Sequence, residues 1–375
     1  MIYLDNAATT MRKPSGVTRA VRDASRDFGG PGRGSHAAAM RAADAMYACR
    51  EAACELFGIQ TPESVILTMN ATHALNIAIK SLARPGKKVL VSGFEHNAVM
   101  RPLRALEAKG VKHETLDTPL FDPGKTYTAF ENALTGDVCL VVCTHVSNVF
   151  GYILPIEKIA GLCRSKGIPL VIDAAQSAGV LPVKENHLRG AVLCMPGHKA
   201  LYGPQGTGLL IVPENIRLTS LTEGGTGSNS LSLDMPPDMP DALEAGTPNA
   251  WGAAGLYEGM KFVMDAGTEE IARRERGLLS LCAGYLYDMS GVRCMYAPDC
   301  QTGVISMVFD NNDAEDVASG LNEKGIAVRA GLQCAPVAHK TAGTLPYGTL
   351  RASFSYFTTP GEIKKFAEAL KGILR

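Results

Sequence analysis

The sequence has no excess of charge of either sign, since its 375 residues contain 37 Lys and Arg against 37 Asp and Glu. A chain with zero formal net charge produces no long-range field that would attract nucleic acid or an anionic membrane surface. Internal repeats and low-complexity segments are also missing. We therefore expect small molecules or other proteins as partners, and neither nucleic acid nor a membrane.

Long apolar runs, C-x-x-C pairs and metal-ligand spacings are missing as well. No stretch approaches the roughly 18 apolar residues that a membrane-spanning helix needs. The first residues, MIYLDNAATT, contain an early Asp5 and no apolar run typical of a secretory signal. The ten cysteines are scattered, which predicts reduced thiols, a cytoplasmic location and no metal site.

Short apolar runs alternate with helix-period segments through much of the chain. Such runs occupy residues 64–69, 87–94, 138–148, 168–176 and 191–195. This alternation predicts an α/β fold with a mainly parallel central sheet and helices on both faces.

Three regions are expected along the chain, because 375 residues exceed what one hydrophobic core usually takes. We place an N-terminal arm at 1–15, a large domain at 16–250 and a smaller α+β domain at 251–375. The smaller domain would begin with a long helical stretch over 251–291. The Gly-, Pro- and Ser-rich segment 223–249 is expected to be a functional loop region.

Polar residues follow each of the expected strands. They are Asn70 and Thr72, Glu95 and His96, His145 and Asn148, Asp173 and Gln176, and His198 and Lys199. Ligands of parallel α/β sheets collect at the carboxyl ends of the strands. The pattern therefore predicts a ligand site at that edge of the sheet.

Lys199 stands in a turn rich in Gly and Pro directly after the apolar run 191–195. A buried lysine amine has a pKa below its reference of about 10.4 and becomes a nucleophile. Pyridoxal phosphate is the cofactor that such a lysine most often holds, as a Schiff base, together with an acid at the pyridine nitrogen, a phosphate cradle and a group stacked on the ring. Asp173, Thr72 and His96 are the candidates for these three roles.

Each of these residues also has an ordinary structural explanation. Lys199 alone would be read as a solvated surface lysine, and Asp173 as a helix N-cap. His96, His145 and His198 would be read as buried core histidines. It is the ordered constellation that favours the cofactor site.

The chain resembles the cysteine desulfurase and selenocysteine lyase family, in the class V aminotransferase group of the pyridoxal-phosphate fold type I superfamily. The resemblance runs over nearly the whole chain in the expected order. It rests on YLDNAATT, THVSNVFG, VIDAAQSAG, PGHKALYGPQGTG, LEAGTPN, RAGLQCAPVAH and RASFSYFTT.

The resemblance implies a role for each matching position. Lys199 would hold pyridoxal phosphate covalently, Asp173 would contact its pyridine nitrogen, and Gln176 its ring hydroxyl. His96 would stack on the ring and share in catalysis. The remaining cofactor contacts would come from Ala71, Thr72, Asn148, His198 and, reaching in from a second subunit, Thr247.

The resemblance also implies the substrate site and the reaction. Arg351, assisted by Asn148, Arg329 and Ala8, would bind the carboxylate of L-cysteine or L-selenocysteine, because guanidinium geometry suits a carboxylate. Cys334, in a loop of the small domain, would attack the substrate sulfur and keep it as a persulfide, while alanine leaves. A homodimer and a sulfur-acceptor or scaffold protein are further expectations.

Other functions share most of these residues. A class V aminotransferase or lyase would use Lys199, Asp173 and Arg351 without depending on Cys334. A selenocysteine lyase would need Cys334 less, because selenide leaves more readily than sulfide. A binding protein with a decayed site would lack the visible absorbance of bound pyridoxal phosphate.

Four positions depart from the family pattern. Pro196 replaces a serine that contacts phosphate in relatives, so one hydrogen bond would be missing or supplied elsewhere. Ala71 and His73 replace the usual threonine or glycine and the usual glutamate. Gln333 replaces the histidine that usually precedes the catalytic cysteine, which predicts a slower enzyme or a preference for another sulfur or selenium substrate.

Overall fold

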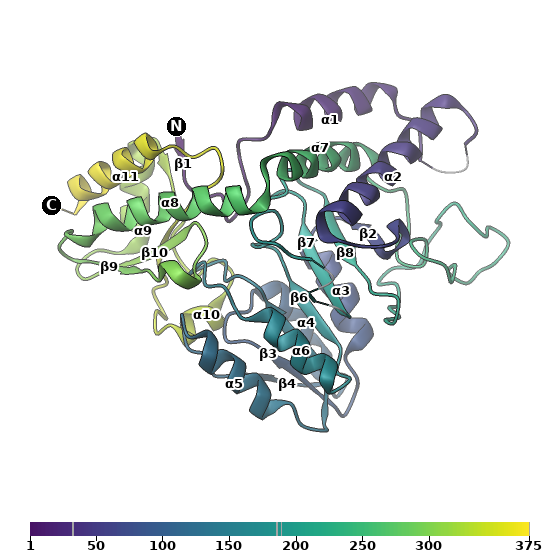
Figure 1. The fold of residues 1–375 in the computed structure, drawn as a ribbon, viewed down its shortest axis with the longest axis horizontal. Coiled ribbons are helices and arrows are strands. Elements are labelled where there is room, and N and C mark those ends of the chain that lie inside the picture. The colour runs from purple at the N-terminus through teal and green to yellow at the C-terminus, as the bar shows by residue number, and fades with distance from the viewer. Residues whose placement is uncertain (32–33, 185–186, 189, 375) are drawn as a thin grey trace.

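A seven-stranded sheet in the order β2-β8-β7-β6-β5-β3-β4 forms the centre of the molecule (Figure 1). The computed structural model describes residues 1–31, 34–184, 187–188 and 190–374. The strands are β2 (Val65–Thr68), β3 (Lys88–Val91), β4 (Lys112–Thr115), β5 (Val138–Thr144), β6 (Leu170–Asp173), β7 (Ala191–Pro196) and β8 (Gly208–Ile211). Only the pairs that involve β8 are antiparallel. The predicted α/β fold with a mainly parallel sheet is therefore confirmed.

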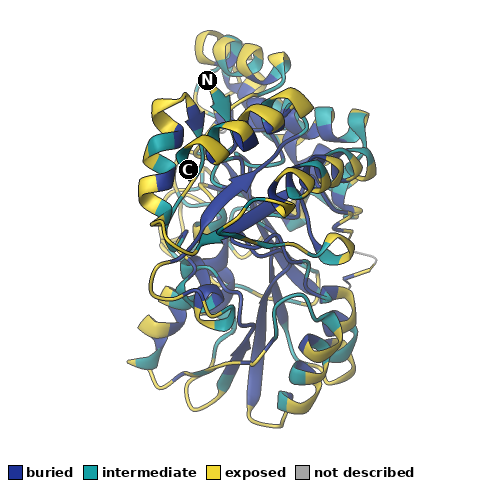
Figure 2. Cartoon of the chain, turned by 90° about the vertical axis from the view of Figure 1, so that its left-hand side faces the viewer, coloured by how far each residue is buried: buried dark blue, intermediate teal, exposed yellow. Residues whose placement is uncertain are grey.

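Alternate residues of the central strands pack into different apolar clusters on the two faces of the sheet. In β7, Leu193 and Met195 belong to one cluster and Val192 and Cys194 to the other. Successive side chains of a strand point to opposite faces, so a strand covered on both sides reads as a continuous apolar run. Figure 2 shows these strands buried along the middle of the molecule.

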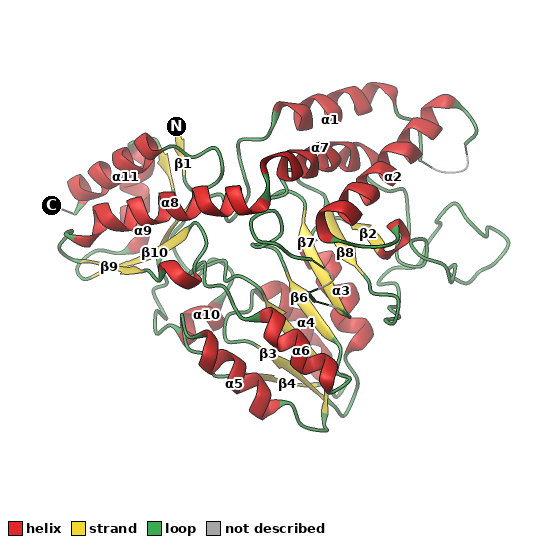
Figure 3. Cartoon of the chain, in the orientation of Figure 1, coloured by secondary structure: helices red, strands yellow, loops and turns green. Residues whose placement is uncertain are grey.

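Helices cover both faces of this sheet (Figure 3). One face packs against α3 (Ala71–Leu82) and α4 (Asn97–Glu107). The other packs against α2 (Ala37–Phe57), α5 (Pro123–Ala133), α6 (Ile156–Ser165) and α7 (Ala250–Ala266), and α1 (Ser15–Asp27) lies on α7. Short 3-10 helices occupy Pro62–Ser64 and Pro298–Cys300.

A smaller antiparallel sheet in the order β12-β10-β9 forms a second core. Its strands are β9 (Val292–Met295), β10 (Val304–Phe309) and β12 (Leu350–Ser353). The helices α8 (Thr268–Tyr287), α9 (Ala314–Glu323) and α11 (Pro360–Ile373) pack around it, and α10 (Pro336–Thr341) follows the cysteine loop. The boundaries at residues 15 and 250 stay predictions.

The N-terminal segment joins this smaller sheet region. Strand β1 (Ile2–Tyr3) pairs in parallel with β11 (Ile326–Ala327), and Asp5 forms a bridge with Ser353. From there the chain runs back to α1 on the large sheet's side (Figure 1). Residues 4–13 therefore connect the two sheets.

The long helical stretch expected from residue 251 is two helices, α7 and α8. Gly267 separates them, with a φ of 79°. Glycine adopts this left-handed conformation without the steric cost that a Cβ imposes. Glu269 and Glu270 then favour a new helix start, because carboxylates interact well with a helix N-terminus.

A buried ion pair anchors the segment between β8 and α7. Arg50 of α2 donates two hydrogen bonds, of 2.9 and 2.8 Å, to the Glu244 carboxylate. The Leu67 amide also donates to Glu244, at 2.6 Å, and Arg50 donates to the Val65 carbonyl. The two charged side chains are 8% and 9% exposed. This arrangement fixes the Gly- and Pro-rich segment, and with it Thr247, against β2.

Replacing Glu244 by alanine should lower the free energy of unfolding by roughly 3–5 kcal/mol, because it leaves Arg50 charged and buried without an oppositely charged partner. Urea unfolding followed by circular dichroism measures the change. Glu368→Ala, which removes an exposed i,i+4 pair with Lys364, is the control and should cost far less. Equal losses in the two variants would contradict the anchoring role of Glu244.

Candidate active site

A cavity of about 260 Å³ lies where the predicted polar residues converge, at the carboxyl edge of the central sheet. All the residues predicted at the strand ends line it, except Glu95 and His145. The other predicted residues in its wall are Ala8, Ala71, Arg329, Cys334 and Arg351. The topology brings them together because β2, β3, β5, β6 and β7 all run in one direction.

Lys199 lies in the turn after β7 and lines the cavity together with Asp173, at the end of β6. Burial lowers the pKa of the Lys199 amine to about 8, while the Asp173 carboxylate raises it and Arg351 lowers it further. Asp173 is 4% exposed and accepts a hydrogen bond of 2.9 Å from the Ala175 amide. The site therefore holds an amine that is partly neutral near physiological pH beside a buried carboxyl group.

The N-terminus of α3 provides an anion-binding surface in the cavity wall. The Asn70 side chain caps the helix by accepting from the His73 amide at 2.9 Å. Among the described residues, the Ala71 and Thr72 amides and the Thr72 hydroxyl donate to no protein acceptor, and both residues line the cavity. Free amides at a helix N-terminus bind phosphate groups.

His96 is held in one orientation as the N-cap of α4. Its Nδ1 accepts a hydrogen bond of 3.0 Å from the Ala98 amide, which leaves the proton on Nε2. Burial, with Lys199 and Arg101, lowers the pKa of His96 to about 4. The ring is consequently neutral near pH 7 and suited to lie against an aromatic ligand.

The N-terminal arm forms hydrogen bonds to the turn that contains Lys199. The His198 carbonyl accepts hydrogen bonds from the Thr10 amide at 3.2 Å and from Lys13 Nζ at 2.8 Å. His198 Nδ1 lies 3.0 Å from the Thr9 hydroxyl. Gln176 donates to the Ala7 carbonyl at 2.9 Å, which leaves its side-chain oxygen available as an acceptor.

Arg351 is the most buried cation in the cavity wall, at 2% exposure. It donates to the Asp5 carboxylate at 2.5 Å and to the Asn148 carbonyl at 2.9 Å. Within the described part of the chain, its Nε and the Asn148 Oδ1 are buried without a hydrogen-bond partner. Such unpaired polar atoms are costly unless a ligand uses them, and an amino-acid carboxylate would match the guanidinium.

Cys334 lines the same cavity and is the exposed member of the ten free cysteines. Its carbonyl accepts a hydrogen bond of 2.8 Å from the Asn97 amide at the start of α4. Arg329 lies nearby with its guanidinium 3.7 Å from Asp5. Cys334, Lys199 and Arg351 thus line one cavity.

Thr247 does not line this cavity within its own chain. It lines an adjacent cavity of about 750 Å³, which also borders Asn70 and His198. Pro196, which does line the active-site cavity, has no side-chain donor to offer. Intrachain donors for a phosphate would therefore be the start of α3 and His198.

These features fit pyridoxal phosphate. The amine of Lys199 lies beside a buried acid, Asp173, and a neutral imidazole, His96. The open amides at the start of α3 suit the phosphate group. The roles of the individual residues stay predictions.

Asp5 and the threonines of the arm were not assigned a role from the sequence, although they belong to the motif YLDNAATT. Their signal was present: an acidic residue followed by hydroxyl residues, in a stretch that matched the family. Glu95, which the sequence analysis named among the strand-end polar residues, does not line the cavity. It is fully buried, its carboxylate accepts from Ser92 and the Thr144 amide, and burial raises its pKa to about 8.

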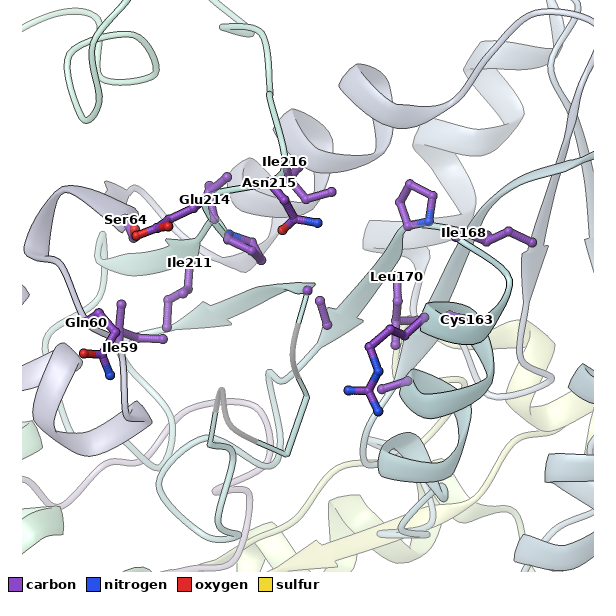
Figure 4. Close-up of a pocket in the computed structure, with 18 of the residues that line it drawn as sticks. Ile59, Gln60, Ser64, Cys163, Ile168, Leu170, Ile211, Glu214, Asn215 and Ile216 are labelled. Atoms are coloured by element: carbon purple, nitrogen blue, oxygen red, sulfur yellow. The ribbon is translucent and has the colours of Figure 1, made fainter.

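A larger cavity, of about 580 Å³, lies at the opposite edge of the sheet, where β6 begins and β8 ends (Figure 4). Its described lining contains no lysine, histidine or aspartate. Its one thiol, Cys163, is buried, and burial raises the pKa of that thiol to about 12, so it is not reactive. This cavity has no set of catalytic groups.

No cluster of three or more potential metal ligands occurs among the residues that the structure describes. In the same residues, we find no helix with the length and apolarity needed to cross a bilayer.

The sequence family described as aminotransferase class-V matches residues 2–366. A probable cysteine desulfurase of Mycolicibacterium paratuberculosis is 31% identical over the whole chain, which spans only 55% of that protein's length. A probable cysteine desulfurase of Methanothermobacter thermautotrophicus is 30% identical, and the match covers 99% of this chain and 94% of the relative.

Solved structures show the same similarity. The apo structure of a cysteine desulfurase from Thermococcus onnurineus NA1 superposes with a TM-score of 0.91 at 28% sequence identity. That match covers 100% of this chain and 94% of the other.

In cofactor-free protein, the rate at which an amine reagent modifies Lys199 should rise with pH and reach half its maximum near pH 8, because burial lowers the pKa to about 8. Peptide mass spectrometry measures this rate. Asp173→Asn should move the midpoint to lower pH, since Asp173 raises the pKa of Lys199, and Arg351→Met should move it to higher pH. A midpoint near the ordinary value of 10.5 would refute a buried amine.

Proposed function

This chain belongs to the aminotransferase class-V family, and from that premise we propose that it is a pyridoxal-phosphate-dependent cysteine desulfurase. It would convert L-cysteine to L-alanine and keep the sulfur as a persulfide on Cys334. The observation that carries the proposal is that Cys334, Lys199 and Arg351 line one cavity.

Each of these residues has a distinct task in the reaction. Arg351 binds the substrate carboxylate, using its buried and unpartnered Nε within the described structure. When bound, pyridoxal phosphate makes the Cα proton of an amino acid removable by drawing electrons away from that carbon. Lys199 takes this proton as the general base, because its amine is neutral in a substantial fraction of molecules near its pKa of about 8.

Cys334 then attacks the substrate sulfur as a thiolate. An S–S bond forms between the two sulfur atoms, and the Cβ–S bond of the substrate breaks. The electron pair of the broken bond takes up a proton at Cβ, which becomes the methyl group of alanine. Two protons are available for the product: the one that Lys199 took from Cα and the one that the Cys334 thiol released when it ionised. One is delivered to Cβ and the other returns to Cα, so that alanine is released and the persulfide stays on Cys334.

Replacing Cys334 by serine should lower alanine formation from L-cysteine by about 100-fold or more, because the nucleophile is lost. The trapped wild-type intermediate should carry the mass of one added sulfur atom on Cys334, and the variant should lack this added mass. The visible absorbance of bound cofactor should persist, which shows that the site is intact.

Cys54→Ser, in the partly buried Cys54 of α2, is the matched control and should keep wild-type activity. Full activity of Cys334→Ser with L-cysteine would favour an aminotransferase or lyase. Activity retained only with L-selenocysteine would favour a selenocysteine lyase.

We infer further that the active unit is a cytoplasmic homodimer in which Thr247 serves the partner's cavity. Thr247 lies outside the cavity of its own chain. The same segment carries Leu231 and Leu233, which are 102% and 105% exposed, as expected for side chains that a second copy would cover. The persulfide would pass to a sulfur-acceptor protein.

Mixing Lys199→Ala and Thr247→Asp chains after denaturation and refolding tests the shared site. Random pairing in a C2 dimer gives about half heterodimers, each with one wild-type site. Alanine formation should then recover to about a quarter of the wild-type rate per site. Recovery no greater than the sum of the two parents would mean that each chain builds its site alone.

A further inference from the structure

The reactive cysteine occupies a backbone conformation that its own residue type disfavours. Gln333 and Cys334 have φ angles of 40° and 57°, in the left-handed region that residues with a Cβ rarely adopt. Two such residues in succession persist only where the surroundings hold them. Contacts from the surrounding residues therefore hold this loop.

The side chain of Gln333 is the centre of these contacts. It is 6% exposed, and its amide nitrogen donates to the carbonyls of Thr349 at 2.9 Å and Arg329 at 3.3 Å. Both partners are acceptors, which fixes the orientation of the amide group. Its oxygen Oε1 therefore faces His339 Nε2, at 2.9 Å.

His339 completes a directed chain of hydrogen bonds. Because Gln333 Oε1 can only accept, His339 Nε2 carries the proton, and Nδ1 accepts from the Thr344 hydroxyl at 2.7 Å. The ring is fully buried, and burial lowers the pKa of His339 to about 4. His339 is thus neutral and bonded to Gln333.

The backbone of the loop is held from the opposite side. The Gln333 carbonyl accepts from Asn148 Nδ2 at 2.8 Å, and the Cys334 carbonyl accepts from the Asn97 amide at 2.8 Å. Asn148 and the start of α4 both belong to the cavity edge of the large sheet. The loop is therefore clamped between the Gln333 side chain and the wall of the active site.

We propose that Gln333 is a positioning residue for Cys334: its side chain, locked by His339 and Thr344, holds the left-handed turn that presents the thiol to the cavity. This role accounts for glutamine at a position where the family usually has histidine. The kinetic consequence rests on the proposed desulfurase function, whereas the structural consequence does not.

Gln333→Met keeps the volume of the side chain and removes all three of its hydrogen bonds. With L-cysteine, kcat for alanine formation should fall by about 10- to 100-fold, because a nucleophile displaced by about 1 Å loses this much rate. KM should change by less than about twofold, since substrate binding does not use Cys334. The absorbance of bound cofactor should be unchanged.

Amide hydrogen exchange gives a readout that needs no activity. In Gln333→Met, exchange in a peptide covering residues 329–336 should accelerate by about tenfold, while the central sheet stays protected. Gln301→Met is the matched control. Gln301 is also a buried glutamine that donates to several carbonyls, and its loss should leave exchange at 329–336 unchanged.

Two more variants test the chain of hydrogen bonds. Gln333→Met combined with His339→Leu should be no slower than Gln333→Met alone, because both belong to one network and their effects are not additive. The kcat of Gln333→Glu, divided by that of the wild type, should fall as pH rises. The reason is that an ionised carboxylate cannot donate a hydrogen bond to the Thr349 carbonyl.

The outcomes separate the two proposals. If the wild type forms no alanine from L-cysteine, the desulfurase function fails, and hydrogen exchange still decides the role of Gln333. If Gln333→Met keeps kcat and exchange within about twofold of wild type, the positioning role is overturned. Equal acceleration at 329–336 in Gln301→Met would also overturn it, because the effect would then be general destabilisation.

Discussion

The buried guanidinium of Arg351 is the contact on which the active-site arrangement depends. It joins three distant parts of the chain: Asp5 of the N-terminal arm, the carbonyl of Asn148 after β5, and β12 of the smaller sheet. A buried charge is tolerated only with partners, so these three parts must assemble together. The cavity exists at the place where they meet.

The charges around the cavity follow from burial. Burial and neighbouring cations depress the pKa values of His96 and His198 to about 4, so both rings are neutral near pH 7. Positive charge is therefore left to Arg351, Arg329 and the fraction of Lys199 that is protonated. This distribution suits a ligand that brings a phosphate at one end and a carboxylate at the other.

The sequence allowed the sheet and the edge that carries the site to be predicted, because strand burial and strand-end polarity are local patterns. Lys199, Asp173 and Cys334 could be singled out through motif order. The pairing of Asp5 with Arg351 could not, since it joins residues 346 positions apart. The direction of the hydrogen bonds of His339 could not be predicted either, because it depends on tertiary contacts. The helix break at Gly267 could not be predicted because it depends on the φ of a single residue.

The position of the N-terminal arm has a consequence for biosynthesis. Residues 2–3 pair with β11, and Asn6 donates to the carbonyl of Ser353, yet a ribosome makes the arm long before it makes those partners. The arm must wait, unpaired, while the large sheet is assembled. Because the same arm also donates to the His198 carbonyl of the lysine turn, the connection between that turn and the smaller sheet is completed only after β11 and β12 have been made.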